Sequence, residues 1–172
     1  MKNLSVYTIV TIASIINILN FMAISYSAQM VSASTIPLIG LPNPNLTPGV
    51  ARQVTQDTLC TTSTKLVRHT SAETKRQVYA EYGLVPKHSP NCTGPSNSCY
   101  EVDHLIALTD GGADVKSNLW IQLYDGPNNA HEKDKLEEKL HSLICTNKMS
   151  MKDAQNCITK NWIACYKKVM VK

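Results

Sequence analysis

The stretch YEVDHLIALTDGG, residues Tyr100 to Gly112, places Asp103 directly before His104, where an apolar run meets a Gly-Gly turn. Burying a carboxylate beside an imidazole costs free energy unless partners satisfy both groups. A single exposed His–Asp contact at a strand end is the simpler interpretation. The pair is also suited to chemistry, because one residue could bind a metal ion while the other accepts a proton.

The residues around this stretch predict the order strand, turn, strand, helix. Two strand-like runs, YEVDHLIAL and NLWIQLY, flank the connection TDGGADVKS, and a helix is expected over residues 129–145. Thr70 as N-cap, Glu73 three residues later and Gly83 at the end delimit an earlier helix. Ser150 caps a final helix that runs to about Lys168. Together these elements predict an α+β fold.

The first 33 residues have the pattern of a secretory signal peptide. Lys2 precedes a long apolar run from Leu4 to Ala23, and VSA at residues 31–33 fits a small-x-small cleavage site. An uncleaved membrane anchor is the alternative, which two Asn residues within the run weaken. Cleavage predicts a secreted or periplasmic protein with no stable membrane association.

The remaining residues are expected to form an arm and one domain. Residues 34–69 begin with the Pro-rich STIPLIGLPNPNLTPG and are predicted to be an extended N-terminal arm, followed by a domain over residues 70–172. Because Lys2 is the only charged residue of the first 33, residues 34–172 carry 16 Lys and Arg against 13 Asp and Glu, a net charge of +3. This small excess is compatible with a polyanionic partner but does not by itself indicate one.

All six cysteines lie after residue 33, which predicts up to three disulfide bonds in an oxidising compartment. No C-x-x-C spacing is present, so a structural zinc site is not indicated. Cys92 and Cys99 bracket the polar loop NCTGPSNSC and are expected to close it.

The other four cysteines are assigned by helix geometry. A continuous helix would hold Cys157 and Cys165 about 12 Å apart, too far to bond each other. Cys60 is therefore expected to pair with one of these two residues and Cys145 with the other, and the choice between the two arrangements stays open.

The motifs from Glu101 to Glu137 resemble those of HNH endonucleases. The matching residues are Asp103 and His104, Asn118 in NLW, and NAHEKDKLE beginning at Asn129. The chain is more closely similar to a secreted bacterial subfamily in which DHLIPLELGGA, NLWPQ and NAHxKDxLE recur. The resemblance is specific over these 37 residues and weak elsewhere.

This resemblance implies a ββα-metal finger at about residues 100–145, between an N-terminal and a C-terminal helix and stapled by disulfides. In such enzymes His104 would be the general base, Asp103 a metal ligand and Asn118 the brace of the loop that orients the base. Ala107 and Ile121 depart from the subfamily, which has proline at both positions.

Helical periodicity favours Asn129 over His131 as the second metal ligand. At about 100° per residue, Asn129 lies on the face of Leu136 and Leu140, whereas His131 lies nearly opposite. A helix that begins one turn later would let His131 turn inward, so His131 is the alternative ligand. Glu137 follows Asn129 by eight residues. Related non-specific ββα nucleases pair a helix Asn with a Glu at this spacing, so Glu137 is expected to bind a metal-coordinated water.

The remaining charged and aromatic residues receive simpler interpretations. Trp120 and Trp162 are expected in the core. Arg68, Lys75 and Arg76 could hold a phosphate or be solvated. A solvated helix face is expected to carry Lys133, Lys135 and Lys139.

The sequence therefore predicts a secreted, metal-dependent endonuclease that hydrolyses phosphodiester bonds of DNA, and of RNA as a second substrate, with little sequence preference. Mg²⁺ is the expected ion, with Mn²⁺ or Zn²⁺ as alternatives. The alternative function is a non-catalytic, disulfide-stapled binding protein that uses the same scaffold.

Overall fold

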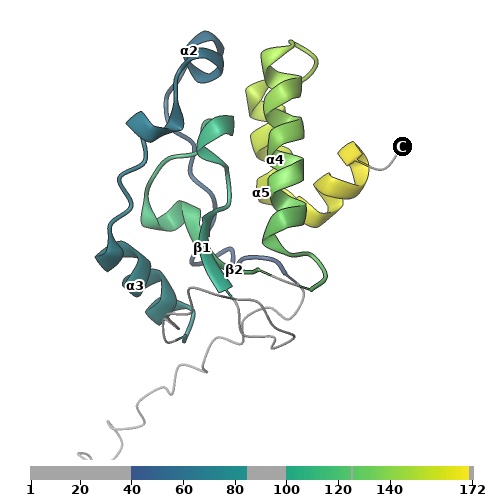
Figure 1. Ribbon diagram of the computed structural model, residues 1–172. Helices are drawn as coiled ribbons and strands as arrows, with labels where there is room; N and C mark the ends of the chain where they lie inside the picture. Colours follow the sequence, from purple (N-terminus) through teal and green to yellow (C-terminus); the bar gives the residue numbers. More distant parts are fainter. Residues whose placement is uncertain (1–39, 85–99, 125, 171–172) are drawn as a thin grey trace, which may run out of the picture. The chain divides into compact units, whose positions relative to one another are not determined.

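The computed structural model describes residues 40–84, 100–124 and 126–170 (Figure 1). These residues form helices and one two-stranded sheet, joined by loops. This mixed content confirms the α+β class. The elements are α2 (Gln56–Thr61), α3 (Ala72–Glu81), β1 (Tyr100–His104), β2 (Leu119–Leu123), α4 (Ala130–Cys145) and α5 (Met151–Met170), with 3₁₀ turns at Thr64–Leu66, Leu108–Asp110 and Lys116–Asn118. Within these residues, no helix is long and apolar enough to cross a membrane. The expected signal peptide and the Cys92–Cys99 loop lie outside the described residues.

The strands β1 and β2 form an antiparallel hairpin in which His104 lies opposite Leu119. The Gly-Gly turn between them depends on both glycines. Gly111 has a φ of +87°, which favours glycine, and a Cβ on Gly112 would lie 1.9 Å from the carbonyl oxygen of Ile106. The turn therefore brings the chain back over the residues that directly follow β1.

The helix α4 presents an apolar face to the core and packs beside α5 (Figure 1). Leu136, Leu140 and Ile144 on this face are fully buried. Trp162 of α5 is 1 % exposed and donates its indole N–H to the carbonyl oxygen of Gly40 at 2.7 Å. Trp120 of β2 is also buried, so the expected core position of both tryptophans is confirmed.

The helix α5 is interrupted at Asn161, and this interruption makes the expected cysteine pairing wrong. Asn161 has extended backbone angles, with φ −173° and ψ 100°, and its Oδ1 accepts a hydrogen bond from the Ala164 N–H at 2.9 Å. It therefore acts as the N-cap of the second half of α5. The bend brings the Cα atoms of Cys157 and Cys165 to 5.4 Å, and the two residues form a disulfide.

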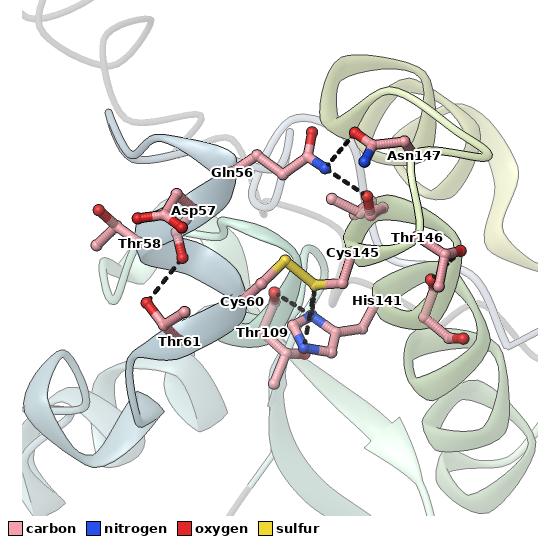
Figure 2. The surroundings of a disulfide bond; sticks show 12 residues. Gln56, Asp57, Thr58, Cys60, Thr61, Thr109, His141, Cys145, Thr146 and Asn147 are labelled. Atoms are coloured by element: carbon pink, nitrogen blue, oxygen red, sulfur yellow. Dashed lines mark hydrogen bonds between the residues drawn. A yellow bond between two sulfur atoms is a disulfide. The ribbon is translucent and has the colours of Figure 1, made fainter.

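The second described disulfide joins Cys60 of α2 to Cys145 at the end of α4, with 5.7 Å between their Cα atoms (Figure 2). Neither residue is tied to α5, contrary to the expectation. Gln56 strengthens the same junction, because its Nε2 donates to the Asn147 side chain at 2.8 Å and to the carbonyl oxygen of Ile144 at 2.7 Å. The disulfide and these hydrogen bonds thus fasten α2 to α4.

Of the expected extended arm, residues 34–69, the structure describes residues 40–69, and this part is not extended throughout. It contains α2, which begins after the N-cap Thr55. Residues before α2 bind the connection between the strands, since Ala51 pairs with Gly112 in an isolated bridge. Arg52 Nη1 donates to the carbonyl oxygens of Leu108 and Gly112 at 2.8 and 2.6 Å. The arm therefore supports the loop that follows β1.

The helix α3 begins one residue later than its sequence suggested. Its N-cap is Ser71, whose Oγ accepts from the Thr74 N–H at 3.0 Å, rather than Thr70. The Thr70 hydroxyl instead donates to the carboxylate of Asp114. This difference ties the start of α3 to the inter-strand connection.

Candidate functional site

A hollow of about 120 Å³ lies beside the end of β1. Three of the candidate catalytic and metal-binding residues line it. They are Asp103 and His104 of β1 and Glu137 of α4. The full lining consists of Thr64, Arg68, Asp103, His104, Ala107, Leu108, Thr109 and Glu137.

The side chain of His104 is 6 % exposed, and its Nε2 lies 2.7 Å from Oδ1 of Asp114. Because a carboxylate only accepts hydrogen bonds, Nε2 carries the proton and Nδ1 keeps the lone pair. Burial lowers the pKa of the His104 imidazole below its ordinary value, although Asp114 and Asp103 oppose this shift. His104 is therefore neutral at pH 7 and has one nitrogen able to accept a proton.

Asp114 is held as an anion by three donors. Besides His104, the Thr70 hydroxyl and the backbone N–H of His69 donate to its carboxylate. Burial raises the pKa of Asp114, but these hydrogen bonds outweigh it and lower the pKa to about 2. Nothing in the sequence shows that Asp114, a loop residue ten positions after His104, returns to the imidazole.

Lys133 is fully buried and does not line the hollow, but it contacts two residues that do, Asp103 and Glu137. Its Nζ donates to Oδ2 of Asp103 and to the carbonyl oxygen of His104, both at 2.6 Å, and to Glu137. Burial lowers the pKa of Lys133, but the two carboxylates outweigh it and raise the pKa above its ordinary value. The expectation of a solvated Lys133 is wrong. Its spacing from Leu136 places it on the inward face of α4, so helical periodicity could have identified it.

Two further carboxyl groups are buried near the hollow. The side chain of Glu137 is 14 % exposed, and burial raises its pKa against the attraction of Lys133. Asp110 is 1 % exposed, and burial raises its pKa to about 7. Both groups therefore take up a proton more readily than exposed carboxyls do.

Asn118 fixes the connection between the strands. It is fully buried, and its Oδ1 accepts from the backbone N–H groups of Ile106 and Val50 at 3.0 and 3.3 Å. Its Nδ2 donates to the carbonyl oxygens of Ile106 and Ala113 at 3.0 and 2.9 Å. Asn118 thus holds the chain directly before Asp114, the partner of His104.

Neither candidate for the second metal ligand lines the hollow. Asn129 is the N-cap of α4, where its Oδ1 accepts from the Glu132 N–H at 3.0 Å and its Nδ2 donates to the Gly126 carbonyl oxygen at 2.6 Å. His131 is exposed and packs edge-on against Tyr124, with 4.5 Å between the ring centroids. The structure therefore brings Asp103, His104 and Glu137 together, but not Asn129 or His131.

The donors around Asp103 do not fit a divalent ion as they are arranged. Such an ion binds several oxygen ligands. Here Oδ2 of Asp103 is paired with Lys133, and the amide of Asn129 is used in the helix cap. Among the described residues, no group of three His, Cys, Asp or Glu side chains is placed to hold a metal ion. The positive charge beside Asp103 is that of the Lys133 ammonium.

Arg68 supplies a second positive charge at the hollow. Its side chain is exposed and forms no ion pair with a carboxylate in the described part of the chain. It lines the same hollow as His104, and its charge contributes to the lowered pKa of that imidazole. An anion that enters the hollow would therefore meet both a guanidinium and a neutral imidazole.

Comparison of the chain with protein-family models, with curated proteins and with solved structures finds no significant match. The function of the protein is therefore inferred from the residues of the hollow and from their geometry.

Proposed function

We propose that the protein is an endonuclease that cleaves phosphodiester bonds in the hollow around His104. The observation that carries this proposal is a buried, neutral His104 held by Asp114 beside Arg68, which pairs with no carboxylate among the described residues. A neutral imidazole can act as general base, and a guanidinium can stabilise the charge that develops on a phosphate. The HNH-like motifs and the succession of β1, β2 and α4 are compatible with this reading.

Each residue then has a distinct role. A phosphate group would bind Arg68, and Nδ1 of His104 would remove a proton from the attacking hydroxyl. Asp114 would orient the imidazole and stabilise the imidazolium that forms, as an aspartate does in a catalytic triad. Asn118 would keep Asp114 in place through the loop that it braces.

The substrate is a nucleic acid, DNA or RNA, that binds mainly through its backbone. The net charge of +3 over residues 34–172 implies few phosphate contacts, so little sequence preference and a moderate salt dependence are expected. Two disulfides are compatible with work outside the cytoplasm. The magnesium ion implied by the HNH resemblance stays a prediction that a cleavage assay can test.

The test is cleavage of labelled DNA and RNA by the purified, oxidised chain. Internal cuts are expected. Arg68→Ala should slow them by about 10²–10³-fold, as removal of a charge-stabilising donor does in other enzymes. Arg76→Ala is the matched control, because Arg76 is also exposed but pairs with Glu73 on α3 and does not line the hollow. Binding of nucleic acid without any cleavage would instead support the non-catalytic binding protein.

A further inference from the structure

The three N–H groups of the Lys133 ammonium are all satisfied by protein acceptors, on Asp103, His104 and Glu137. We propose that the site cleaves RNA without a divalent metal ion, with Lys133 as its resident cation. This inference rests on the proposed nuclease function and names its substrate class.

Lys133 is a positioning residue, since it acts through its partners. One ammonium binds the side chain of Asp103 and the main chain of His104, so it fixes the end of β1 against α4. In doing so it neutralises the carboxylate that the HNH resemblance assigns to a metal ion. A divalent ion at Asp103 would have to displace this ammonium or bind within a few ångströms of it, where the two positive charges repel.

The ammonium of Lys133, which binds the carboxylate of Asp103 where a metal ion would otherwise bind, favours RNA over DNA as the substrate. Hydrolysis of DNA needs a water molecule that is bound, oriented and deprotonated, and a metal ion commonly does all three. RNA carries its nucleophile, the 2′-hydroxyl, next to the phosphorus, so the nucleophile is already in place. A general base and a cation at the phosphate are then sufficient, and these are His104 and Arg68.

The proposed reaction is an internal transphosphorylation. Nδ1 of His104 takes the proton of the 2′-hydroxyl, the O2′–P bond forms and the P–O5′ bond breaks. The leaving O5′ takes a proton from water, and the resulting hydroxide removes the proton from the imidazolium. The products are a 2′,3′-cyclic phosphate and a 5′-hydroxyl, and the enzyme returns to its starting state.

The experiment compares three oligonucleotides of one sequence: RNA, 2′-O-methyl RNA and DNA. Each is incubated with the oxidised wild-type chain in EDTA and, separately, in Mg²⁺ or Mn²⁺. We expect RNA to be cut equally well in EDTA and in Mg²⁺, and its fragments to carry cyclic phosphate in mass spectra. The other two substrates, which lack a free 2′-hydroxyl, should be cut at least about 10²-fold more slowly because the general base has no proton to remove.

The outcomes separate this inference from the proposed function. Cleavage that requires Mg²⁺ or Mn²⁺, or that proceeds as well on 2′-O-methyl RNA and DNA, would overturn the inference and leave the endonuclease in place. No cleavage of any substrate under any condition would overturn both.

Calorimetric titration with Mn²⁺ tests the role of Lys133 without using activity. The wild type should bind no Mn²⁺ at its hollow, whereas Lys133→Gln should gain binding because Asp103 and Glu137 lose their ammonium. Lys135→Gln is the matched control, since Lys135 lies on the exposed side of α4. If Lys133→Gln does not fold, the wild-type titration alone tests whether Asp103 binds a divalent ion. Tight Mn²⁺ binding by the wild type that Asp103→Asn abolishes would contradict the proposal.

Discussion

Ionisable side chains with little access to water meet at the end of β1, and five of them depend on one another. His104 is held by Asp114, and Asp103 and Glu137 share Lys133. Removal of one member of such a buried set leaves the charge of its partner uncompensated. The stability lost in this way is greater than the net stability that the intact set contributes. The site is therefore expected to tolerate few single substitutions.

Asp110 gives the folded protein a characteristic pH dependence. Its pKa is raised to about 7, so its contribution to stability is fully present below its ordinary pKa of 3.8 and is lost as the pH rises through about 7. We expect Asp110 alone to lower the free energy of unfolding by up to about 3 kcal/mol between about pH 5 and pH 8. In Asp110→Asn this fall should be smaller, although Glu137 contributes a change of the same sign.

Urea unfolding at the two pH values measures the effect. Asp57→Asn is the control, because Asp57 is exposed in the first turn of α2 and its replacement should leave the slope unchanged. An Asp110→Asn variant with the wild-type pH dependence would show that Asp110 is ionised at neutral pH.

The residues of the site differ in how far the sequence could predict them. Asp103, His104 and Glu137 belong to recognisable motifs, and they do line one hollow. Helical periodicity places Lys133 on the inward face of α4. Lysines on a helix are usually solvated, however, and this general tendency favours the wrong prediction of an exposed side chain. Asp114 depends on how the inter-strand loop folds back. Only tertiary structure shows that relation.

At the scale of secondary structure elements, alternation of apolar residues and capping signals predicted the hairpin, α4 and the start of α5. The interruption of α5 was missed, although Asn161 is a residue type that favours helix N-caps. A hydrophobic pattern that continues on both sides of Asn161 predicts one continuous helix. Such a helix would hold Cys157 and Cys165 about 12 Å apart, too far to form a disulfide. The cysteine pairing failed for this reason alone.

The role of Asn129 in α4 can be tested by exchanging its cap. Asn129→Ala should cost about 1 kcal/mol of stability, whereas Asn129→Ser should cost only a few tenths because serine also caps helices well. Neither change should alter nucleic-acid cleavage, since Asn129 does not line the hollow. If Asn129 were a metal ligand, Asn129→Ser would impair cleavage as severely as Asn129→Ala. Unfolding and cleavage measured on the same preparations distinguish the two roles.

For the molecule as a whole, the two described disulfides differ in the length of chain that they close. Cys60 and Cys145 are 85 residues apart and join α2 to α4, whereas Cys157 and Cys165 are 8 apart within α5. In the chain-entropy model a longer closed loop gives greater stabilisation. Loss of Cys60–Cys145 is therefore expected to cost about 4 kcal/mol and loss of Cys157–Cys165 about 2–3 kcal/mol.

Urea unfolding of the two double variants, Cys60→Ala with Cys145→Ala and Cys157→Ala with Cys165→Ala, compares these costs directly. Each variant is the control for the other, because both remove two sulfur atoms from α-helices. A larger loss from the Cys157–Cys165 variant would mean that the bend at Asn161 depends on its disulfide more than the attachment of α2 depends on Cys60.

His104 is the proposed general base of the nuclease site, and His104→Ala removes its imidazole. The cleavage rate on labelled RNA and DNA is measured for the wild type, for His104→Ala and for His131→Ala, whose side chain is exposed outside the hollow. Loss of a general base should slow cleavage by about 10²–10⁴-fold, while nucleic-acid binding persists. His131→Ala should cut at the wild-type rate. Cleavage by His104→Ala as fast as by the wild type would show that His104 is not the general base.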